Sequence, residues 1–465
     1  MNYFLMPHPP VIIPEIGQGE ERKVINTVKA CIQIGEKINA VNPDTIIIIS
    51  PHGVVFKDAV AMITSKELKG DFGKFGAPQV EFNCHIDLKL TKSIIDNANN
   101  YGIQVAEINE KSSVRYNVPF ELDHGAMVPL YFIDKNRSYD LIHVTYGFLS
   151  ATELLKFGLA IRRAAKESNK NIVVIASGDL SHRLTKDGPY EYSPNGNEFD
   201  KTLIEVLQSG DLKGIFNINK RLIMDAGECG LRSLYILAGI ISTEKIKTKL
   251  YSYEGPLGVG YAVMDFQEGS GDLYKAVVEE KRKEHERKIK EGSPYTRLAR
   301  KNLDSYYSSG TLLNIDDIEE EALILDKKGV FVSLKADGEL RGCIGTIEPT
   351  TSCVGEEIIR NSISAALDDP RFHPVKAGEL MDIDISVDLL YPPEPADFED
   401  LDPACYGVIV TSGSKKGLLL PNLDGVDTKE QQLQIAMSKG NISPSEAYKL
   451  ERFKVERFKE WEESE

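Results

Sequence analysis

The stretch TIIIIS (residues 45–50) decides the fold of the first half of the chain. A strand with one face in water alternates apolar and polar residues, whereas an unbroken β-branched run is typical of a central strand covered on both faces. The stretches YDLIHVTYG (139–147) and NIVVIASGDLSH (171–182) have the same character. Together these runs predict buried strands in a sheet that has helices on both faces.

Helical patterns lie between these apolar runs throughout the first 268 residues. Strands that alternate with helices in this way predict an α/β domain with a mainly parallel sheet flanked by helices. The stretch VGYAVMDF (259–266) is expected to form the last strand of this domain. The helices are expected near residues 18–40, 86–101, 151–168 and 197–208.

The composition changes after this domain. The stretch EEKRKEHERKIKEGSP (279–294) is almost entirely charged and predicts a solvated helix. The remainder has its own strands and helices, and KADGEL (335–340) is typical of a hairpin, so we expect an α+β domain. The sequence therefore predicts three parts: a first domain over 1–268, a charged helical linker over 269–293 and a second domain over 294–465.

The composition of the 465 residues restricts the class of protein. Hydrophobic residues make up 42% and charged residues 27%, which is ordinary for a globular chain of two or three domains. The net charge of −16 argues against a nucleic-acid partner, because phosphates are bound by clustered lysine and arginine. No apolar run approaches the roughly 20 residues that span a bilayer. The start MNYFLMPHPP lacks the basic region and cleavage site of a signal peptide. We therefore expect a cytoplasmic protein that binds neither nucleic acid nor membrane.

The cysteines argue against two kinds of structural site. They are scattered along the chain and show no C-x-x-C spacing, so neither structural zinc nor a disulfide framework is expected. The six are Cys31, Cys84, Cys229, Cys343, Cys353 and Cys405.

Four of the eight histidines occupy similar places in the sequence. His8, His52 and His182 each follow an apolar run, and His124 lies in the loop sequence ELDHGAMVPL. Ligands of open α/β sheets bind at the carboxyl ends of the strands, so these histidines are expected to converge on one edge. The other four are expected elsewhere: His85 and His143 with partners in or beside their own elements, His285 in solvent and His373 in the second domain.

Two histidines and one carboxylate would form a facial metal site that suits non-haem Fe(II). The carboxylate candidate is Glu228, in MDAGECGLRSLYILAGII (224–241). A second interpretation is a capping box, in which Asp225 is the N-cap residue and Glu228 reaches back to it. The neighbouring Cys229 is a further candidate ligand. The residues alone leave these alternatives open.

Five motifs in this order make the first domain resemble the class III extradiol ring-cleavage dioxygenases, a group that includes the Memo-like proteins. The motifs are MPHPP, SPHG, DHGAMVPL, SGDLSH and AGECGLRSL. The resemblance implies that His8, His52 and Glu228 hold Fe(II) or another divalent metal. It also implies that His124 and His182 act as acid/base residues on a small aromatic diol, with O₂ as the second substrate.

The second domain resembles the AMMECR-type domain. Such domains occur fused to Memo-like domains or encoded beside radical-SAM proteins, so a radical-SAM partner protein is an expectation. Arg341, Cys343 and His373 offer an anion holder, a thiol and a base, and they form a candidate second site. Cys343 has the alternative interpretation of a small core residue on a strand. The motifs are ELRGCIGT (339–346), DDPRFHPV (368–375) and KKGLLLP (415–421).

The leading hypothesis for function is a non-haem Fe(II)-dependent extradiol-type dioxygenase that opens a catechol-like ring in aromatic compound metabolism. One alternative is a Memo-like metal-binding scaffold or redox protein without ring cleavage, and another is a metal-dependent hydrolase. The presence of His124 and His182 favours an enzyme. Memo-like members carry a cysteine near the third ligand position, and Cys229 matches it and favours the scaffold. The sequence leaves the substrate and any self-association of the chain open.

Overall fold

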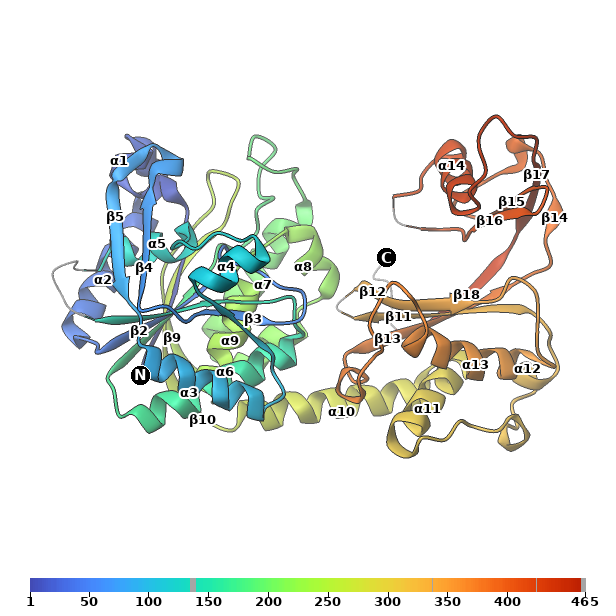
Figure 1. Ribbon diagram of the computed structural model, residues 1–465, viewed down its shortest axis with the longest axis horizontal. Coiled ribbons are helices and arrows are strands. Elements are labelled where there is room, and N and C mark those ends of the chain that lie inside the picture. Colours follow the sequence, from blue (N-terminus) through green and yellow to red (C-terminus); the bar gives the residue numbers. More distant parts are fainter. Residues whose placement is uncertain (134–138, 337, 424, 461–465) are drawn as a thin grey trace. The chain divides into compact units, whose positions relative to one another are not determined.

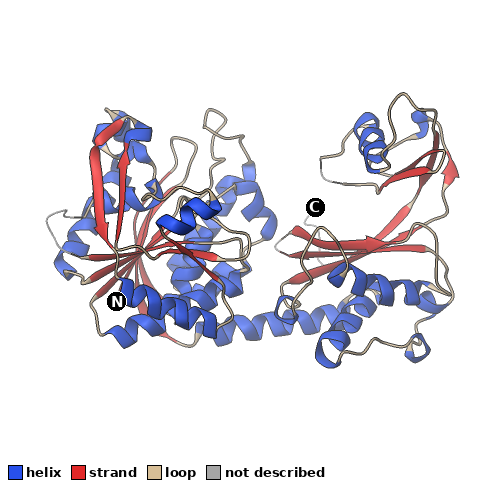
Figure 2. Cartoon of the chain, in the orientation of Figure 1, coloured by secondary structure: helices blue, strands red, loops and turns tan. Residues whose placement is uncertain are grey.

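The computed structural model describes residues 1–133, 139–336, 338–423 and 425–460. The chain divides into two compact units, Met1–Glu280 and Lys281–Glu465 (Figure 1). The expected α/β class is confirmed, with one large mixed sheet in the first unit and smaller sheets in the second (Figure 2).

The large sheet of the first unit is parallel at its centre. Its strand order is β6-β3-β7-β2-β8-β1-β10-β9. The pairs β7–β2, β2–β8 and β8–β1 are parallel, whereas β10 is antiparallel to both β1 and β9. The β3–β7 pair on the other side is antiparallel, although the edge pair β6–β3 beyond it is parallel again. The strands are β1 (Asn2–Met6), β2 (Thr45–Ser50), β3 (Val60–Ile63), β6 (Val105–Ile108), β7 (Asp140–Thr145), β8 (Ile172–Ser177), β9 (Lys245–Glu254) and β10 (Tyr261–Ser270).

Strand β2, at the centre of the large sheet, explains the unbroken apolar run of its sequence. All six of its residues are buried. Ile47 and Ile49 belong to the hydrophobic core on one face of the sheet, and Ile46 and Ile48 belong to the core on the other face. Alternate side chains of a strand point to opposite faces, so both faces had to be apolar.

Helices cover both faces of this sheet. Helices α3 (Leu88–Asn100), α6 (Ala151–Ser168), α7 (Pro194–Ser209) and α9 (Leu231–Ile241) contribute to the first core. Helices α2 (Ile25–Val41) and α5 (His124–Tyr131) contribute to the second. Shorter helices are α1 (Pro14–Gly17), α4 (Glu110–Tyr116) and α8 (Lys220–Ala226).

A separate hairpin stands beside the large sheet (Figure 1). Strands β4 (Glu67–Phe72) and β5 (Ala77–His85) form a two-stranded sheet, and a short helical turn, Gly73–Phe75, joins them. Gly76 closes this turn with a φ of 83°, a conformation that favours glycine. The hairpin carries Phe75 to the region of the histidines described below.

The second unit contains two four-stranded sheets, as expected for an α+β domain. The first sheet has the order β12-β11-β13-β18, and the second has the order β14-β17-β15-β16. Its helices are α11 (Pro294–Ser309), α12 (Glu321–Ile324), α13 (Val354–Leu367) and α14 (Lys429–Lys439). Its strands are β11 (Gly329–Ala336), β12 (Glu339–Gly345), β13 (Ile383–Leu390), β14 (Glu394–Pro395), β15 (Gly407–Ser412), β16 (Lys415–Leu419), β17 (Lys449–Phe453) and β18 (Val455–Lys459).

Helix α10 (Leu273–Glu291) lies within the predicted charged linker. Its first turns belong to the first unit, where Leu273 and Val277 are buried in the core. Its later turns belong to the second unit. The expectation that His285 lies in solvent is wrong, because its Nε2 is 2.8 Å from the Asp304 carboxylate and only 14% of its side chain is exposed.

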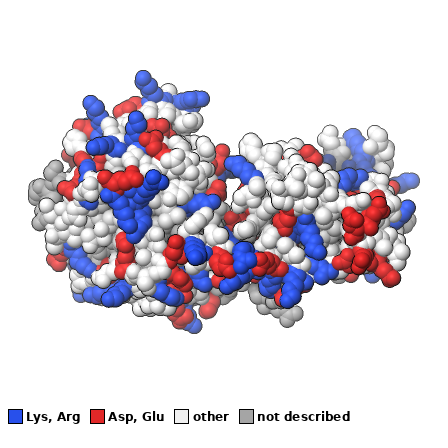
Figure 3. Space-filling view, turned by 90° about the horizontal axis from the view of Figure 1, so that it is seen from below, with Lys and Arg blue, Asp and Glu red and all other residues white. Residues whose placement is uncertain are grey.

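Acidic and basic side chains are interspersed on the face shown in Figure 3, without a large area of one sign. Along α10 the charges partly neutralise one another, since Arg282 pairs with Glu286 and Arg287 pairs with Glu284. Within the described residues, no helix combines the length and apolar character needed to cross a bilayer.

Candidate metal centre

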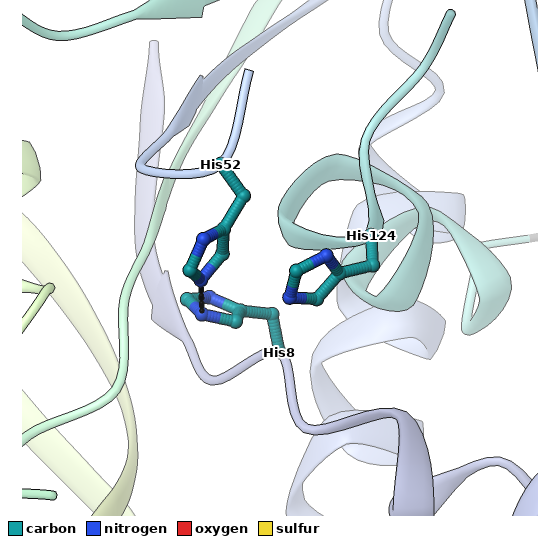
Figure 4. A group of neighbouring side chains, drawn as sticks. All are labelled: His8, His52 and His124. Atoms are coloured by element: carbon teal, nitrogen blue, oxygen red, sulfur yellow. Dashed lines mark hydrogen bonds between the residues drawn. The ribbon is translucent and has the colours of Figure 1, made fainter. Parts of the chain in front are cut away.

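Three histidines from distant parts of the chain meet at the carboxyl edge of the large sheet (Figure 4). His8 follows β1, His52 follows β2, and His124 is the first residue of α5. Each offers one ring nitrogen, and these three atoms lie within 4.8 Å of one another. The Nε2 atoms of His8 and His52 are 2.9 Å apart, and the rings of His52 and His124 stack with centroids 4.2 Å apart. The expected convergence of strand-end histidines therefore occurs for these three.

The ring of His8 is fixed by hydrogen bonds to strand β8. Ser177 Oγ donates its single proton to the carbonyl oxygen of Gly125 at 2.5 Å. The same oxygen therefore accepts the N–H of His8 Nδ1, which is 2.9 Å away. The backbone N–H of His8 donates to Asp179 Oδ1 at 2.9 Å. This arrangement puts the lone pair of His8 on Nε2, the atom that faces His52 Nε2 at 2.9 Å and that a metal ligand would use.

The three rings are held in the neutral form. Burial lowers the pKa of His8 well below its usual value, and the neighbouring His52 and His124 lower it further. Burial also lowers the pKa of His52 to about 4 and that of His124 below its usual value. Metal ligation needs neutral imidazole, so these rings are ready to bind an ion without first losing a proton.

His124 is positioned by the residue before it. Asp123 is the N-cap of α5, where its carboxylate accepts from the backbone N–H of Ala126. It also accepts from the Ser50 hydroxyl, and its Oδ2 is 2.6 Å from Nε2 of His143. Burial would raise the pKa of Asp123, but the hydrogen bonds and charge of His143 and the Ser50 hydroxyl hold it below its usual range. His143 thus has the partner beside its own element that the sequence led us to expect.

Glu228 lies in the loop just before α9 and is not one of the three converging side chains. Its carboxylate accepts the backbone N–H of Leu231, the first residue of α9, at 2.6 Å, although the N-cap residue of this helix is Gly230. The capping box expected with Asp225 is wrong, because Asp225 lies inside α8 and accepts from the Asn195 side chain. Within the described residues, the group able to share one ion consists of His8, His52 and His124, and ligation by Glu228 stays a prediction.

Two further groups lie close to His8. Cys229 Sγ is 3.6 Å from His8 Nε2, and an oxygen of Asp179 is 3.7 Å from the same nitrogen. The backbone N–H of Asp179 donates to Cys229 Sγ at 3.4 Å. Burial raises the pKa of Asp179 to about 7 and raises the pKa of the Cys229 thiol well above its usual value. The sequence pointed to Cys229, but the place of Asp179 beside His8 depends on the pairing of β1 with β8.

His182 follows β8, as expected, and its side chain is partly buried. Its ring stacks on Tyr190 with centroids 5.1 Å apart. Burial, with a contribution from His52, lowers the pKa of His182 to about 4. His182 is thus close enough to His52 for their charges to interact, but its ring nitrogens do not belong to the group that could share one ion. Its acid/base role stays a prediction.

A cavity of about 190 Å³ lies beside His52 and His124. Its walls come from strand β3, the β4–β5 hairpin and the loop before α5. Phe75 of the hairpin approaches His124 with ring centroids 5.3 Å apart. The apolar lining residues are Val54, Ala61, Met62, Ile63, Phe75, Ile108, Pro119, Leu122 and Met127. The polar lining residues are Asp71, Lys74, Glu121, Asp123, His143 and Thr145.

The candidate second site in the second unit is built differently. The Arg341 guanidinium binds Glu379 and donates to the backbone carbonyl of His373 at 2.8 Å. The Cys343 thiol accepts from the Ser333 hydroxyl at 3.1 Å. Burial raises the pKa of this thiol. Among the described residues, no hydrogen bond or ion pair connects the side chains of Arg341, Cys343 and His373 to one another.

The guanidinium that approaches Cys343 is that of Arg371 rather than Arg341. It donates to the Cys343 carbonyl at 3.2 Å and forms two hydrogen bonds with Asp369. The sequence analysis named only Arg341, and the place of Arg371 beside Cys343 became clear only in the fold.

Two proteins are similar in sequence to this chain, one over its whole length and one over about a third of it. A Clostridium acetobutylicum protein is 48% identical over 465 residues and covers 99% of both chains. A Thermotoga maritima protein is 47% identical over 169 residues, which are 36% of this chain and 97% of that protein.

Solved structures resemble parts of the chain. A crystal structure of an uncharacterized protein from Pyrococcus horikoshii is 31% identical, covers 36% of this chain and 90% of that chain, and has a TM-score of 0.34. One from Escherichia coli K12 is 14% identical, covers 57% of this chain and 99% of that chain, and has a TM-score of 0.38.

Two family models match the two units. Residues 2–264 match the catalytic LigB subunit of aromatic ring-opening dioxygenase, and residues 296–461 match AMMECR1. The order and extent of these matches confirm both resemblances drawn from the sequence. The chain therefore belongs to the family of the catalytic LigB subunit of aromatic ring-opening dioxygenase, and it carries an AMMECR1 domain after that region.

Proposed function

We propose that the first unit is a non-haem Fe(II) dioxygenase of the extradiol type, which opens the ring of a small aromatic diol with O₂. The observation that carries this proposal is the meeting of His8, His52 and His124 beside a cavity of about 190 Å³. The family of the chain is named for a ring-opening reaction, which supports the same assignment.

The donor set fits a divalent transition metal. Imidazole nitrogens suit iron, zinc and copper, and three ligands leave coordination positions for substrates. His8 and His52 would hold the ion. His124 is the third donor that the geometry favours over Glu228, whose carboxylate accepts the backbone N–H of Leu231. Ferrous iron, when bound there, would supply the joint binding of a diol and O₂ that ring opening requires.

Residues around the centre would orient the ligands and move protons. Ser177 and Asp179 hold the ring and backbone of His8, so they would fix its direction before an ion arrives. A diol must release a proton as it binds, and the neutral ring of His182 can accept one. Tyr190 stacks on that ring and would limit its rotation.

A second function is favoured by one specific contact. Cys229 Sγ is 3.6 Å from His8 Nε2, and a thiolate together with imidazoles suits a softer metal such as Cu(I). Under this reading the unit is a metal-binding redox protein that opens no ring. The thiol would have to lose its proton on metal binding, against the burial that raises its pKa.

Metal content and turnover distinguish these two functions. The full chain would be prepared without oxygen, loaded with Fe(II), Zn(II) or Cu(I), and tested with a panel of catechols under air. The dioxygenase assignment expects tight iron binding and ring-fission products. Iron-loaded protein that binds catechols and opens none would replace it with the redox assignment, and Cys229→Ser should then reduce Cu(I) affinity while leaving Fe(II) affinity unchanged.

A further inference from the structure

Hydrogen bonds to neighbouring segments fix the loop after β8, which carries His182. The carbonyl of Ser181 accepts from the N–H of Gly260 at 2.8 Å, and the N–H of His182 donates to the carbonyl of Ala226 at 3.0 Å. The N–H of Ser181 donates to a side chain instead, at 2.7 Å from Asp200 Oδ1. The peptide groups on both sides of Ser181 are therefore held in place, and they set the point from which the His182 side chain extends.

Asp200 is a buried carboxylate without a cation beside it. It lies on α7 and none of its surface is exposed. Its Oδ2 accepts from the Tyr253 hydroxyl at 2.7 Å. Among the described residues, no lysine, arginine or histidine forms an ion pair with it. Burying a carboxylate in this way is costly, which indicates that its hydrogen bonds to Ser181 and Tyr253 are needed.

The neighbouring backbone makes room for this carboxylate. A Cβ atom at Gly260 would lie 2.1 Å from Asp200 Oδ2 and 3.0 Å from the Leu180 side chain. The N–H of Leu180 also donates to the carbonyl of Gly260 at 2.8 Å, so the two segments are in direct contact. A larger residue at position 260 would therefore displace either the carboxylate or the loop that it holds.

We propose that Asp200 is a positioning residue for His182, which it orients through the backbone N–H of Ser181, and that its negative charge strengthens this hold. A charged acceptor forms a hydrogen bond roughly twice as strong as a neutral one does. The inference deepens the proposed function, since it rests on that function for the acid/base role of His182. The hydrogen bond itself requires neither metal nor substrate.

The charge of Asp200 changes near neutral pH. Burial raises its pKa to about 7, the hydrogen bonds from Ser181 and Tyr253 oppose this shift, and the charge of Glu228 adds to it. Tyr253 acts from β9 and Glu228 from the loop before α9. Asp200 is ionised above this pKa, so its hold on Ser181 should weaken as the pH falls through about 7. The pKa of His182 is about 4, which separates its own protonation from this change.

The amide proton of Ser181 reports this hydrogen bond in metal-free full-length protein. In a sample labelled with ¹⁵N-serine, its resonance is identified by its loss in Ser181→Ala. It should move upfield as the pH falls through about 7, because the acceptor loses its charge. Asp200→Asn should abolish this titration. Tyr253→Phe should move its midpoint to higher pH, because a donor that stabilises the carboxylate is lost. Asp179 has a similar pKa, so these two variants, rather than the midpoint, identify Asp200.

The ring protons of His182 report its position without turnover, because the stacked Tyr190 ring shifts their resonances. Asp200→Ala should move these resonances toward those of an unstacked histidine, and Asp200→Asn should move them less, since asparagine keeps an acceptor for Ser181. The control is Asp265→Asn, which changes another buried carboxylate that accepts from a tyrosine hydroxyl and should leave both sets of resonances unchanged.

Turnover by iron-loaded protein is a separate measurement. Asp200→Asn should lower kcat about fivefold, the difference between a charged and a neutral acceptor. Asp200→Ala should lower it about 10²-fold, the usual cost of a misplaced group. KM should change little in either variant. Neither variant should lower the rate further in a His182→Ala background, because Asp200 acts through His182.

Three results would each overturn the proposal. One is a Ser181 amide that does not titrate, or that still titrates in Asp200→Asn. Another is a set of His182 ring resonances that Asp200→Ala leaves unchanged. The third is a loss of kcat in Asp200→Ala that adds in full to the loss in His182→Ala, which would make Asp200 a structural residue only. Iron-loaded protein that opens no catechol would remove the proposed function, and the two resonance measurements would still decide whether Asp200 positions His182.

Discussion

The histidine centre of the first unit and the cysteine-arginine cluster of the second unit, formed by Arg341, Cys343 and Arg371, both contain side chains able to act in chemistry. They differ in whether their charged groups are already paired. Around Cys343 the charged groups neutralise one another, since Arg341 binds Glu379 and Arg371 binds Asp369. At the histidine centre, His8 and His52 direct ring nitrogens at each other, and the pKa of each ring is lowered. The difference teaches that chemically capable residues become a candidate metal site where the fold turns their ring nitrogens toward one another, and not where each charged group is already paired with an opposite charge.

The largest expected effect is loss of the metal on changing a histidine of the centre. His8→Ala or His52→Ala should reduce bound metal to below about a tenth of the wild-type content, because two remaining donors hold a divalent ion poorly. Metal would be measured after anaerobic loading and desalting. Cys343→Ser in the second unit is the matched control and should change nothing.

The third ligand is decided by the same measurement. His124→Ala should lower metal content as His8→Ala does, whereas Glu228→Gln should retain it, because glutamine keeps the acceptor for Leu231. The opposite result would return Glu228 to the ligand set and leave His124 as an acid/base residue.

The next effect concerns turnover without loss of metal. His182→Ala should keep metal near the wild-type level and lose about 10² to 10⁴ in rate on an accepted catechol, the usual value of one general acid or base. Tyr190→Phe keeps an aromatic ring against His182 and should change the rate little. Loss of metal in His182→Ala would instead make His182 a ligand.

A smaller effect is expected from the hydroxyl that orients His8. Ser177→Ala removes the acceptor for Nδ1 and should weaken metal affinity by about 10- to 100-fold, the usual value of such an orienting partner. Ser333→Ala in the second unit, which removes the donor to Cys343, is the control. Equal affinities of Ser177→Ala and wild type would mean that the strand ends alone orient the ring.

The smallest expected effect is a pH-dependent change in the stability of the second unit, which depends on the ion pair of Asp369 with Arg371. Hydrogen bonds from Arg371 lower the pKa of Asp369 from 3.8 to about 2. A carboxylate with a depressed pKa stabilises the fold above its unfolded-state pKa, and this stabilisation is lost as the pH falls through the folded value. The stability of the second unit against urea should therefore decrease as the pH is lowered from about 4 to about 2. Asp369→Asn and Arg371→Gln should both reduce this pH dependence, and a dependence unchanged by either variant would assign it to other carboxylates.

The sequence was most informative where a single element carries the information. The four isoleucines of β2 require apolar surroundings on both faces, which is a local property of the strand. His8 and His52 follow strands of one parallel sheet, so their convergence follows from topology. The two domains were recognisable because their motifs occur in order along each half of the chain.

The parts that the sequence could not provide depend on contacts between distant residues. Ser177 lies next to His8 only because β1 pairs with β8. The Ser177 hydroxyl is in turn oriented by the carbonyl of Gly125 in α5, a helix that lies between the two strands in sequence. His143 was expected to have partners in or beside its own element, and its place in the wall of the cavity became visible only with the hairpin and the loop before α5 in place. One signal was present: a histidine interrupts an otherwise apolar buried strand at this position.

The position of β1 in the sheet has a consequence for when the centre can form during synthesis. This strand precedes the other strands of the sheet in the chain, yet its two neighbours are β8 and β10. Leu5 pairs with Ala176 of β8, and Tyr3 pairs with Phe266 of β10. The partners that orient His8, namely Ser177 and Asp179, are also made late. Contacts between such distant segments form slowly and require both segments to be present. His8 therefore has no neighbouring strand to orient it until β8 and β10 have been synthesised, so a metal ion held by His8 as proposed would have to load after the whole sheet has been translated.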